Sequence, residues 1–322
     1  MMSIMSKPAL DYEALRGSTV LVTGAAGFIG THLLAKLKFH GASVIAVDRT
    51  TREGIHPADV TDFNEVKKSF ELSRKFYGKP IEYVFHLAGQ KSAGISRQLP
   101  LETLQASFQS TLNILEAART ETIIKKVILI SSLVVYGQNE DRNQNLLKES
   151  DPIRADSVYS AAKITAEFAG LSYLSDFGLP VSIARLANVY GPGQSKEAVI
   201  PSLIYQMATS NEISMGNTDA VRDFIYVEDI VMGLLALALS DEASGHAFNV
   251  GTGQGTSIKT VVEILSRILN FTGRITIDQS KVRANEKSFV VADIQFVSGV
   301  TGWFPRMKLA TGLHQTVMYE RG

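Results

Sequence analysis

Tyr159 and Lys163 are the side chains of this 322-residue sequence whose types and spacing most directly suggest proton transfer. They lie in residues 157–173, a run of good helix formers without an internal proline, and residues four apart on a helix share one face. A free tyrosine has a pKa near ~10 and is a poor base at neutral pH. A nearby ammonium favours the phenolate and lowers that pKa, so the spacing predicts a proton-transfer pair. The same spacing also arises by chance, as a half-buried aromatic beside a solvated lysine. The rest of the sequence must decide between this interpretation and a proton-transfer pair.

Composition excludes several functional classes. The length suggests about two domains, and an apolar content of 45% is ordinary for a globular protein with a sizeable core. Lys+Arg and Asp+Glu both number 32, which gives no electrostatic reason to expect nucleic-acid binding. The absence of cysteine rules out disulfides, cysteine-ligated zinc and thiol nucleophiles. No apolar run reaches the ~18 residues of a membrane span, and the first ten residues are too short and polar for a signal peptide. We therefore expect a cytoplasmic protein without a membrane partner or a metal.

Three glycines stand between an expected strand and an expected helix. Residues 18–23 form a β-branched run typical of a buried strand, and residues 31–39 read as an amphipathic helix. Between them, Gly24, Gly27 and Gly30 follow the spacing G-x-x-G-x-x-G. Glycines in this place let the backbone approach a pyrophosphate, and the helix N-terminus adds N–H groups and a positive dipole end. A tight turn that only packs the helix is the alternative, but the position between strand and helix favours a nucleotide.

Asp48 ends the second apolar strand, about 20 positions after the glycine loop, where an acidic residue binds the adenosine ribose hydroxyls. Its charge would repel a 2′-phosphate, which favours NAD over NADP, whereas Arg49 and Arg52 could pair with such a phosphate. Asp59, followed by Val60, could contact the adenine amino group or cap the helix that comes next. The sequence leaves both interpretations of Asp59 open.

Two further expected strands end in residues that could face a ligand. Residues 81–87 run into a turn of small residues that contains Lys91, and residues 126–130 run into Ser131 and Ser132. The carboxyl ends of parallel strands form the ligand crevice of such sheets. Lys91 could reach a ribose or phosphate, or be an exposed loop lysine. A serine could hydrogen-bond a substrate hydroxyl and the tyrosine of the pair, or the two serines could form only a turn.

Strand–helix alternation over the first ~185 residues predicts an α/β fold with a doubly wound parallel sheet of the Rossmann type. The later part is mixed α/β and smaller, and we expect it to cover the crevice and select the substrate. A short tail is expected from Gly302 onward.

Taken together, these residues resemble the extended short-chain dehydrogenase/reductase family, the nucleotide-sugar epimerases and dehydratases. The matching elements run in the family order over nearly the whole chain, and within the family residues 88–96 and 100–102 are most similar to the UDP-galactose 4-epimerases. The matching elements are residues 23–30, Asp48, Asp59 with Val60, residues 86–89, Ser131 with Ser132, residues 135–137, Tyr159 with Lys163, residues 185–188 and 190–192, Arg222 with Asp223, Val227 with Asp229, and residues 248–251.

The resemblance implies a role for each matching position. Ser132, Tyr159 and Lys163 are the implied catalytic residues. The residues implied to contact NAD are Gly24, Ala26, Gly27, Phe28, Ile29, Gly30, Asp48, Arg49, Asp59, Val60, Leu87, Ala88, Gly89, Lys91, Ser107, Ser131, Tyr159 and Lys163. Those implied to contact a nucleotide-diphosphate sugar are Lys91, Ser132, Asn188, Val199, Ile200, Arg222, Arg283 and Glu286. The implied NAD-binding domain spans residues 1–185 and about 221–250, and the nucleotide-sugar-binding region spans residues 186–220 and 251–322.

Departures from the family pattern narrow the implied reaction. The 4,6-dehydratases place an Asp-Glu acid/base pair after the serine or threonine, where this chain has Leu133 and Val134. The glutamate of the UDP-glucuronate decarboxylases and the cysteine of the GDP-fucose synthases are absent as well. Ser107 stands where the family usually has asparagine.

The resemblance thus points to an NAD-dependent nucleotide-sugar 4-epimerase, which oxidises C4 transiently to a 4-keto sugar and reduces it on the opposite face. An NAD(P)H-dependent 4-keto-sugar reductase with the same catalytic residues is the alternative. A non-catalytic dinucleotide sensor is disfavoured because Ser132, Tyr159 and Lys163 are all present. By analogy we expect a homodimer formed through the helices over residues 101–119 and 157–173, whose apolar residues could otherwise face only their own sheet.

Overall fold

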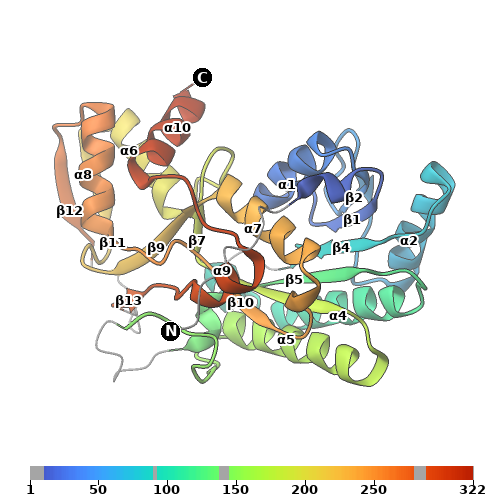
Figure 1. The fold of residues 1–322 in the computed structure, drawn as a ribbon. Helices are drawn as coiled ribbons and strands as arrows, with labels where there is room; N and C mark the ends of the chain where they lie inside the picture. Colours follow the sequence, from blue (N-terminus) through green and yellow to red (C-terminus); the bar gives the residue numbers. More distant parts are fainter. Residues whose placement is uncertain (1–10, 90–92, 138–144, 279–287, 322) are drawn as a thin grey trace.

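A parallel sheet forms the centre of the molecule in a computed structural model that describes residues 11–89, 93–137, 145–278 and 288–321 (Figure 1). The strand order is β10-β6-β5-β4-β1-β2-β3, and each neighbouring pair is parallel. The strands are β1 (Thr19–Thr23), β2 (Ser43–Asp48), β3 (His56–Pro57), β4 (Tyr83–His86), β5 (Lys126–Ser132), β6 (Val181–Leu186) and β10 (Ala247–Val250). The predicted doubly wound sheet is confirmed. The chain reverses its direction of growth between β1 and β4, so the ligand crevice of such a sheet lies at their carboxyl ends.

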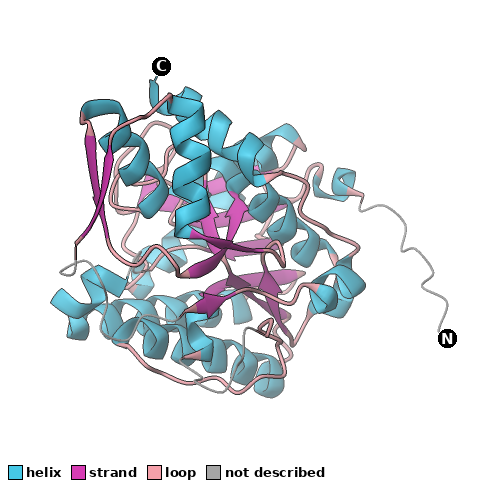
Figure 2. Cartoon of the chain, turned by 90° about the vertical axis from the view of Figure 1, so that its left-hand side faces the viewer, coloured by secondary structure: helices cyan, strands magenta, loops and turns pink. Residues whose placement is uncertain are grey.

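Helices cover both faces of this sheet, which is why its strands read as continuous apolar runs. Val20 and Val22 of β1 pack in one core cluster, and Leu21 between them packs in a second cluster on the other face. Helices α1 (Phe28–Phe39) and α7 (Val227–Leu239) contribute to the first cluster and lie above the sheet in Figure 1. Helices α2 (Phe63–Tyr77), α4 (Pro100–Arg119) and α5 (Val158–Phe177) cover the other face, where α4 and α5 lie side by side. Figure 2 shows these helical layers from the side.

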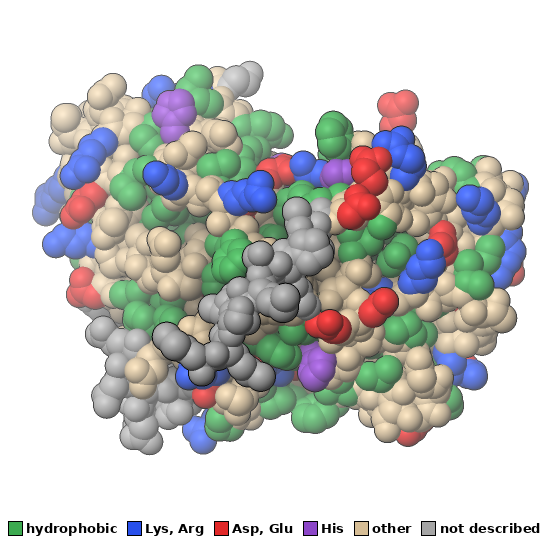
Figure 3. Space-filling view, in the orientation of Figure 1, with side chains coloured by type: hydrophobic (Ala, Val, Ile, Leu, Met, Phe, Trp, Pro, Cys, Tyr) green, Lys and Arg blue, Asp and Glu red, His purple; other side chains and the backbone are tan. Residues whose placement is uncertain are grey.

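A second, smaller region follows β6 in the chain. Strand β9 (Val221–Tyr226) pairs with β7 (Asn188–Tyr190), β11 (Gly255–Ser257) and β13 (Phe289–Val290), and β8 (Glu212–Met215) pairs with β12 (Arg274–Ile277). Helices α6 (Val199–Thr209), α8 (Ile258–Leu269) and α10 (Leu309–Arg321) enclose a separate apolar cluster in this region. In Figure 3 a notch in the upper outline separates this region from the part that holds α1 and β2.

Two details differ from the sequence expectations. The tail predicted to be short contains the 13-residue helix α10, whose Leu313 and Val317 are buried in the smaller region's core. Strand β9 falls within the segment expected to join the dinucleotide-binding part, yet it pairs in the smaller sheet. After it, α7 packs against the main sheet and β10 is a strand of that sheet. The division into two domains itself stays a prediction.

The remaining helices are short: η1 (Tyr12–Leu15), α3 (Ala93–Gln98), η2 (Leu133–Tyr136), η3 (Asp241–Ala243) and α9 (Gln295–Thr301). Among the described residues, no helix combines the length and apolar character needed to cross a membrane. The same residues contain no group of three or more histidine and acidic side chains that could hold a metal ion. Acidic and basic side chains are interspersed over the face drawn in Figure 3.

Candidate active site

The glycine loop between β1 and α1 is shaped by close backbone contacts. Gly24 has a φ of 68°, and a Cβ added to it would lie 2.7 Å from the backbone nitrogen of Ala88. A Cβ at Gly30 would collide with the carbonyl oxygen of Gly24. Gly27 is the N-cap of α1 and offers no side chain to its first turn, so the N–H groups of Phe28, Ile29 and Gly30 have no intrahelical acceptor. The loop therefore presents free backbone donors at a helix N-terminus, as a bound phosphate requires.

Asp48 is held against this loop. Its Oδ2 accepts a hydrogen bond from the backbone N–H of Ala26 at 3.0 Å, and its Oδ1 accepts one from Thr50 at 2.8 Å. The carboxylate thus lies where β2 ends and the glycine loop begins, which is the position of a ribose-binding acid. The exposed Arg49 follows it directly.

Asp59 is not the cap of the following helix, so that interpretation is wrong. The N-cap of α2 is Asp62, whose side chain accepts a hydrogen bond from Asn64. The Oδ1 of Asp59 instead accepts from the backbone and the hydroxyl of Thr61, at 2.9 and 2.8 Å. Burial opposes ionisation here, but the bonds from Thr61 and the nearby Arg49 guanidinium lower the pKa of Asp59. Val60 is buried, and its carbonyl accepts from Asn113 at 3.0 Å.

The end of β4 meets the glycine loop from the other side of the crevice. The backbone N–H of Ala88, after Leu87, donates to the Thr23 hydroxyl at 3.2 Å. A Cβ at Gly89 would lie 3.9 Å from the Nζ of Lys163, so this turn comes close to the lysine of the expected pair. Lys91 lies outside the described residues.

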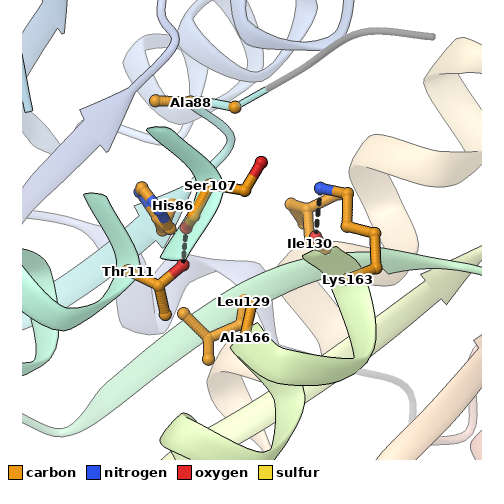
Figure 4. A pocket seen from close by; sticks show the side chains of 9 residues that line it. His86, Ala88, Ser107, Thr111, Leu129, Ile130, Lys163 and Ala166 are labelled. Carbon is orange, nitrogen blue, oxygen red and sulfur yellow. Dashed lines mark hydrogen bonds between the residues drawn. The ribbon is translucent and has the colours of Figure 1, made fainter. Parts of the chain in front are cut away.

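A cavity of about 10 Å³ lies behind this turn, between α4, α5 and the strands β4 and β5. Figure 4 shows the Ser107 hydroxyl and the Lys163 ammonium both directed toward the space between them. His86 lines the same cavity, and its Nδ1 lies 2.8 Å from the Thr23 hydroxyl. Burial, with the charge of Lys163, lowers the pKa of His86 to about 3, so this ring is neutral.

The expected catalytic residues lie on β5 and α5, which pack against each other. Ser132 is the last residue of β5, and its hydroxyl accepts a hydrogen bond from the backbone of Val134 at 3.4 Å. A capping box between Ser157 and Ser160 begins α5, so Tyr159 falls in its first turn. Lys163, one turn later, places its Nζ 5.9 Å from the centre of the Tyr159 ring.

The expected lowering of the tyrosine pKa is wrong for the protein alone. The Lys163 ammonium donates to the carbonyl oxygen of Ile130 at 2.9 Å (Figure 4), and burial raises the pKa of Tyr159 to about 12. Burial also lowers the pKa of Lys163 to about 8, against the attraction of Glu167. Tyr159 therefore keeps its proton at neutral pH unless further positive charge comes close to it.

A buried polar network under this pair was not predicted from the sequence. Glu167 stands four residues after Lys163 and so continues the row begun by Tyr159. Its carboxylate accepts from the Ser131 hydroxyl at 2.5 Å and from Arg185 at 2.7 Å. Arg185 also donates to the hydroxyl of Tyr136, which in turn donates to Asn249. The i, i+4, i+8 spacing of Tyr, Lys and Glu is the signal that could have indicated the network.

The residues expected to bind substrate lie mostly in the smaller region. Asn188 is exposed on β7, and Val199 is partly exposed at the start of α6. Arg222, on β9, is half-buried and donates to the carbonyl of Val221 at 2.9 Å. Ile200 is only 1% exposed and packs in the core of that region. Arg283 and Glu286 lie outside the described residues.

Comparison with known proteins adds to this geometry. A family model described as the NAD dependent epimerase/dehydratase family matches residues 20–251. The chain is 31% identical over 316 residues to a protein of Methanocaldococcus jannaschii named provisionally as a UDP-glucose 4-epimerase, covering 94% of this chain and 98% of that protein. It is 30% identical to the GDP-6-deoxy-D-mannose reductase of Pseudomonas aeruginosa, covering 91% and 94% of the two chains. The crystal structure of the Thermus thermophilus UDP-glucose 4-epimerase complex with NAD superposes with a TM-score of 0.83 at 27% identity, over 94% of this chain and 99% of that one.

Proposed function

Because the chain belongs to the NAD-dependent epimerase/dehydratase family, we propose that it is a nucleotide-sugar 4-epimerase. The observation that carries this choice is the segment after Ser132. There η2 presents the buried Leu133 and the half-buried Val134, neither of which can transfer a proton. Dehydration needs an acid and a base at this place, whereas epimerisation at C4 needs only the tyrosine, the lysine and the serine that the site contains.

NAD is the cofactor of the family, and the residues present fit it. The free N–H groups at the start of α1 suit the pyrophosphate, and the Asp48 carboxylate beside them suits the adenosine ribose. The bound cofactor would supply a reversible hydride acceptor for C4 of the sugar. Asp48 favours NAD over NADP because its charge opposes a 2′-phosphate.

Proton transfer is assigned to Tyr159. We propose that its oxygen takes the proton from the sugar 4-hydroxyl, and that Ser132 orients this hydroxyl and stabilises the developing carbonyl oxygen. Since burial raises the pKa of Tyr159 to about 12, the phenolate needs positive charge that outweighs the cost of burial. Lys163 supplies one such charge from the next turn of α5, and the oxidised cofactor carries another.

The substrate class proposed is a nucleotide-diphosphate sugar. Arg222 on β9 is assigned to the diphosphate, and the exposed Asn188 on β7 to the diphosphate or the sugar. These two strands are paired, so both side chains belong to one sheet at the edge of the smaller region. The relatives named as UDP-glucose 4-epimerases favour uridine as the base.

A 4-keto-sugar reductase is the second candidate, because a relative that is 30% identical is named a GDP-6-deoxy-D-mannose reductase. The same three catalytic residues would serve it, and Arg49 beside Asp48 could accept a 2′-phosphate. The two candidates differ in whether the cofactor is consumed.

The test is turnover of a panel of UDP- and GDP-sugars with NAD far below the substrate concentration, followed by NMR of the sugar ring. Conversion to the C4 epimer without net NADH formation is the expected result. Stoichiometric oxidation of added NADH or NADPH by a 4-keto sugar, with no epimer formed, would instead identify the protein as a reductase.

A further inference from the structure

Lys163 and Glu167 bind consecutive residues of β5, just before Ser132. The Lys163 ammonium donates to the carbonyl oxygen of Ile130 at 2.9 Å. One helical turn later, the Glu167 carboxylate accepts from the hydroxyl of Ser131 at 2.5 Å. These two bonds fix the register of α5 against β5, and Tyr159 and Ser132 lie on those two elements.

Glu167 is a buried carboxylate whose charge is balanced. It is 3% exposed, and Arg185 on β6, 6% exposed, binds it with Nε at 3.0 Å and Nη2 at 2.7 Å. Arg185 is itself held by Tyr136, whose hydroxyl accepts from Nη1 at 2.9 Å. A two-point bond between a guanidinium and a carboxylate fixes direction as well as distance. Removal of one partner would leave a buried charge without compensation.

Several elements of the described part of the chain place groups around Lys163. Its own helix contributes Tyr159 and Glu167, β5 contributes a backbone carbonyl, and β6 contributes Arg185 behind Glu167. The others, from β4 and α4, carry no charge at neutral pH and are His86, Ser107 and Thr111. Among the residues that the structure describes, Glu167 is therefore the carboxylate whose charge acts on Lys163.

We propose that Glu167 is a positioning residue for the catalytic pair: with Arg185 it fixes α5 against β5, and its charge keeps Lys163 in the ammonium form. Burial lowers the pKa of Lys163 to about 8, close to the physiological range, and the attraction of Glu167 opposes this shift. Without that charge, Lys163 loses its proton at a lower pH and no longer favours the Tyr159 phenolate.

The effect of the Glu167 charge on Lys163 can be measured without enzymatic turnover. The titration of Lys163 is followed in the free protein by NMR of its ε-carbon, assigned with a Lys163→Met variant. In Glu167→Gln, which keeps hydrogen-bonding atoms but removes the charge, the titration midpoint should move to lower pH. The matched control is Asp176→Asn, which removes one negative charge from the exposed last turn of the same helix and should leave the midpoint in place.

A second variant is needed because an unpaired Arg185 could destabilise the fold of Glu167→Gln. Glu167→Gln combined with Arg185→Met removes the guanidinium that would otherwise stay buried without its partner. Because Glu167 is the charge that acts on Lys163, the double variant should show a shift in the same direction. An unchanged midpoint in the folded single or double variant, or an equal shift in Asp176→Asn, overturns the proposal.

The kinetic consequence rests on the proposed function. In Glu167→Gln, kcat should fall about tenfold or more while KM for the sugar nucleotide changes about twofold at most, because the residue does not touch substrate. The alkaline limb of the pH–rate profile should move to lower pH together with the NMR midpoint. If no sugar nucleotide is turned over at all, the proposed function fails, while the NMR titration still decides the role of Glu167.

Discussion

Two regions of the molecule are each held together by one buried carboxylate. Glu167 lies on α5, which carries the proposed catalytic pair, and its charge is balanced by the guanidinium of Arg185. Asp223, 0% exposed on β9, has neutral donors: the backbone N–H groups of Thr252, Gly253 and Ala292, and the Thr252 hydroxyl. The first carboxylate joins β5, β6 and α5, and the second joins β9 to the segments that follow β10 and β13.

The difference matches what each region has to do. Beside the proposed catalytic pair, Glu167 places a negative charge near a lysine whose own charge the proposed mechanism needs. Its ion pair with Arg185 would therefore affect the pKa of Lys163 as well as hold the elements together. The Asp223 carboxylate fixes three chain segments near Arg222. Its backbone donors are neutral, so they bind the carboxylate without adding a positive charge. Burial raises the pKa of Asp223, and the hydrogen bonds oppose that shift. Changes in the first region should therefore act on turnover, and changes in the second on binding and stability.

Tyr159→Phe should give the largest effect. Loss of the hydroxyl removes the proposed proton acceptor and should lower kcat by about 10³-fold, within the range for general acid–base catalysis. Binding of the sugar nucleotide, measured by calorimetry, should change only a few-fold. The matched control is Tyr205→Phe, at an exposed tyrosine of α6, which should retain full turnover. A Tyr159→Phe variant with more than about a tenth of the normal rate would contradict the assignment.

Asp223→Ala should act in the other region. It leaves the buried N–H group of Ala292 and the partly buried N–H groups of Thr252 and Gly253 without their acceptor, and an unsatisfied buried donor costs about 1–3 kcal/mol. Thermal unfolding should show a loss of about 3 kcal/mol or more, and KM should rise with kcat nearly unchanged. Asp219→Ala, which removes an exposed aspartate just before β9, controls for the loss of charge. If Asp223→Ala instead lowered kcat and left KM unchanged, the contrast between the two regions would fail.

The fold could be predicted because each of its elements is indicated by a pattern within a short stretch of sequence. The β-branched runs are strands buried on both faces, and Gly24 occurs where the backbone just after β4 comes too close for a side chain. Asp48 could be placed because a parallel sheet brings the ends of β1 and β2 together. These features depend on short stretches of chain and on one topology rule.

The rest of the site depends on contacts that no local pattern contains. Whether the Lys163 ammonium meets Tyr159 or the Ile130 carbonyl depends on the register of α5 against β5. The partner of Glu167 is Arg185, which lies on another strand. Ile200 was expected near substrate, but its side chain turns into the core because α6 presents that face to α8 and α10. An amphipathic helix reveals which residues are apolar, but not which of them reach a pocket.

We propose that the homodimer expected from the sequence forms through the outer face of α4 and α5. These helices lie side by side and expose large apolar residues, namely Leu101, Leu104, Phe108, Phe168 and Phe177. On α4 they recur three and four residues apart, which forms one stripe. We expect a mass of twice 35.0 kDa by light scattering. A Phe168→Glu variant should weaken the dimer by about 2 kcal/mol or more, and Phe304→Glu, away from both helices, should not. A wild-type monomer at micromolar concentration would refute the contact.

His32 on α1 contacts both α7 and the segment after β7, and its substitution should give the smallest effect. Its Nδ1 lies 2.7 Å from the carboxylate of Glu228 on α7, and its Nε2 lies 2.9 Å from the carbonyl oxygen of Pro192. Both acceptors are satisfied only when both ring nitrogens carry hydrogen, so the folded protein favours the imidazolium. The bond to Glu228 raises the pKa of His32, against the opposing effect of burial, and the same bond lowers the pKa of Glu228.

The sign of the pH dependence follows from these two shifts. A histidine with a raised folded pKa contributes stability that is fully present below its unfolded pKa and is lost as pH rises through the folded pKa. Glu228 keeps its charge until pH falls through its own lowered value. Wild type should therefore exceed His32→Gln in unfolding free energy at about pH 6, by less than about 1 kcal/mol because the pair is partly exposed, and this advantage should shrink toward about pH 9. His314→Gln, at an exposed histidine of α10, controls for the loss of an imidazole ring. A stability difference that stays constant over this range would mean that the link acts through packing against Phe28 and not through charge.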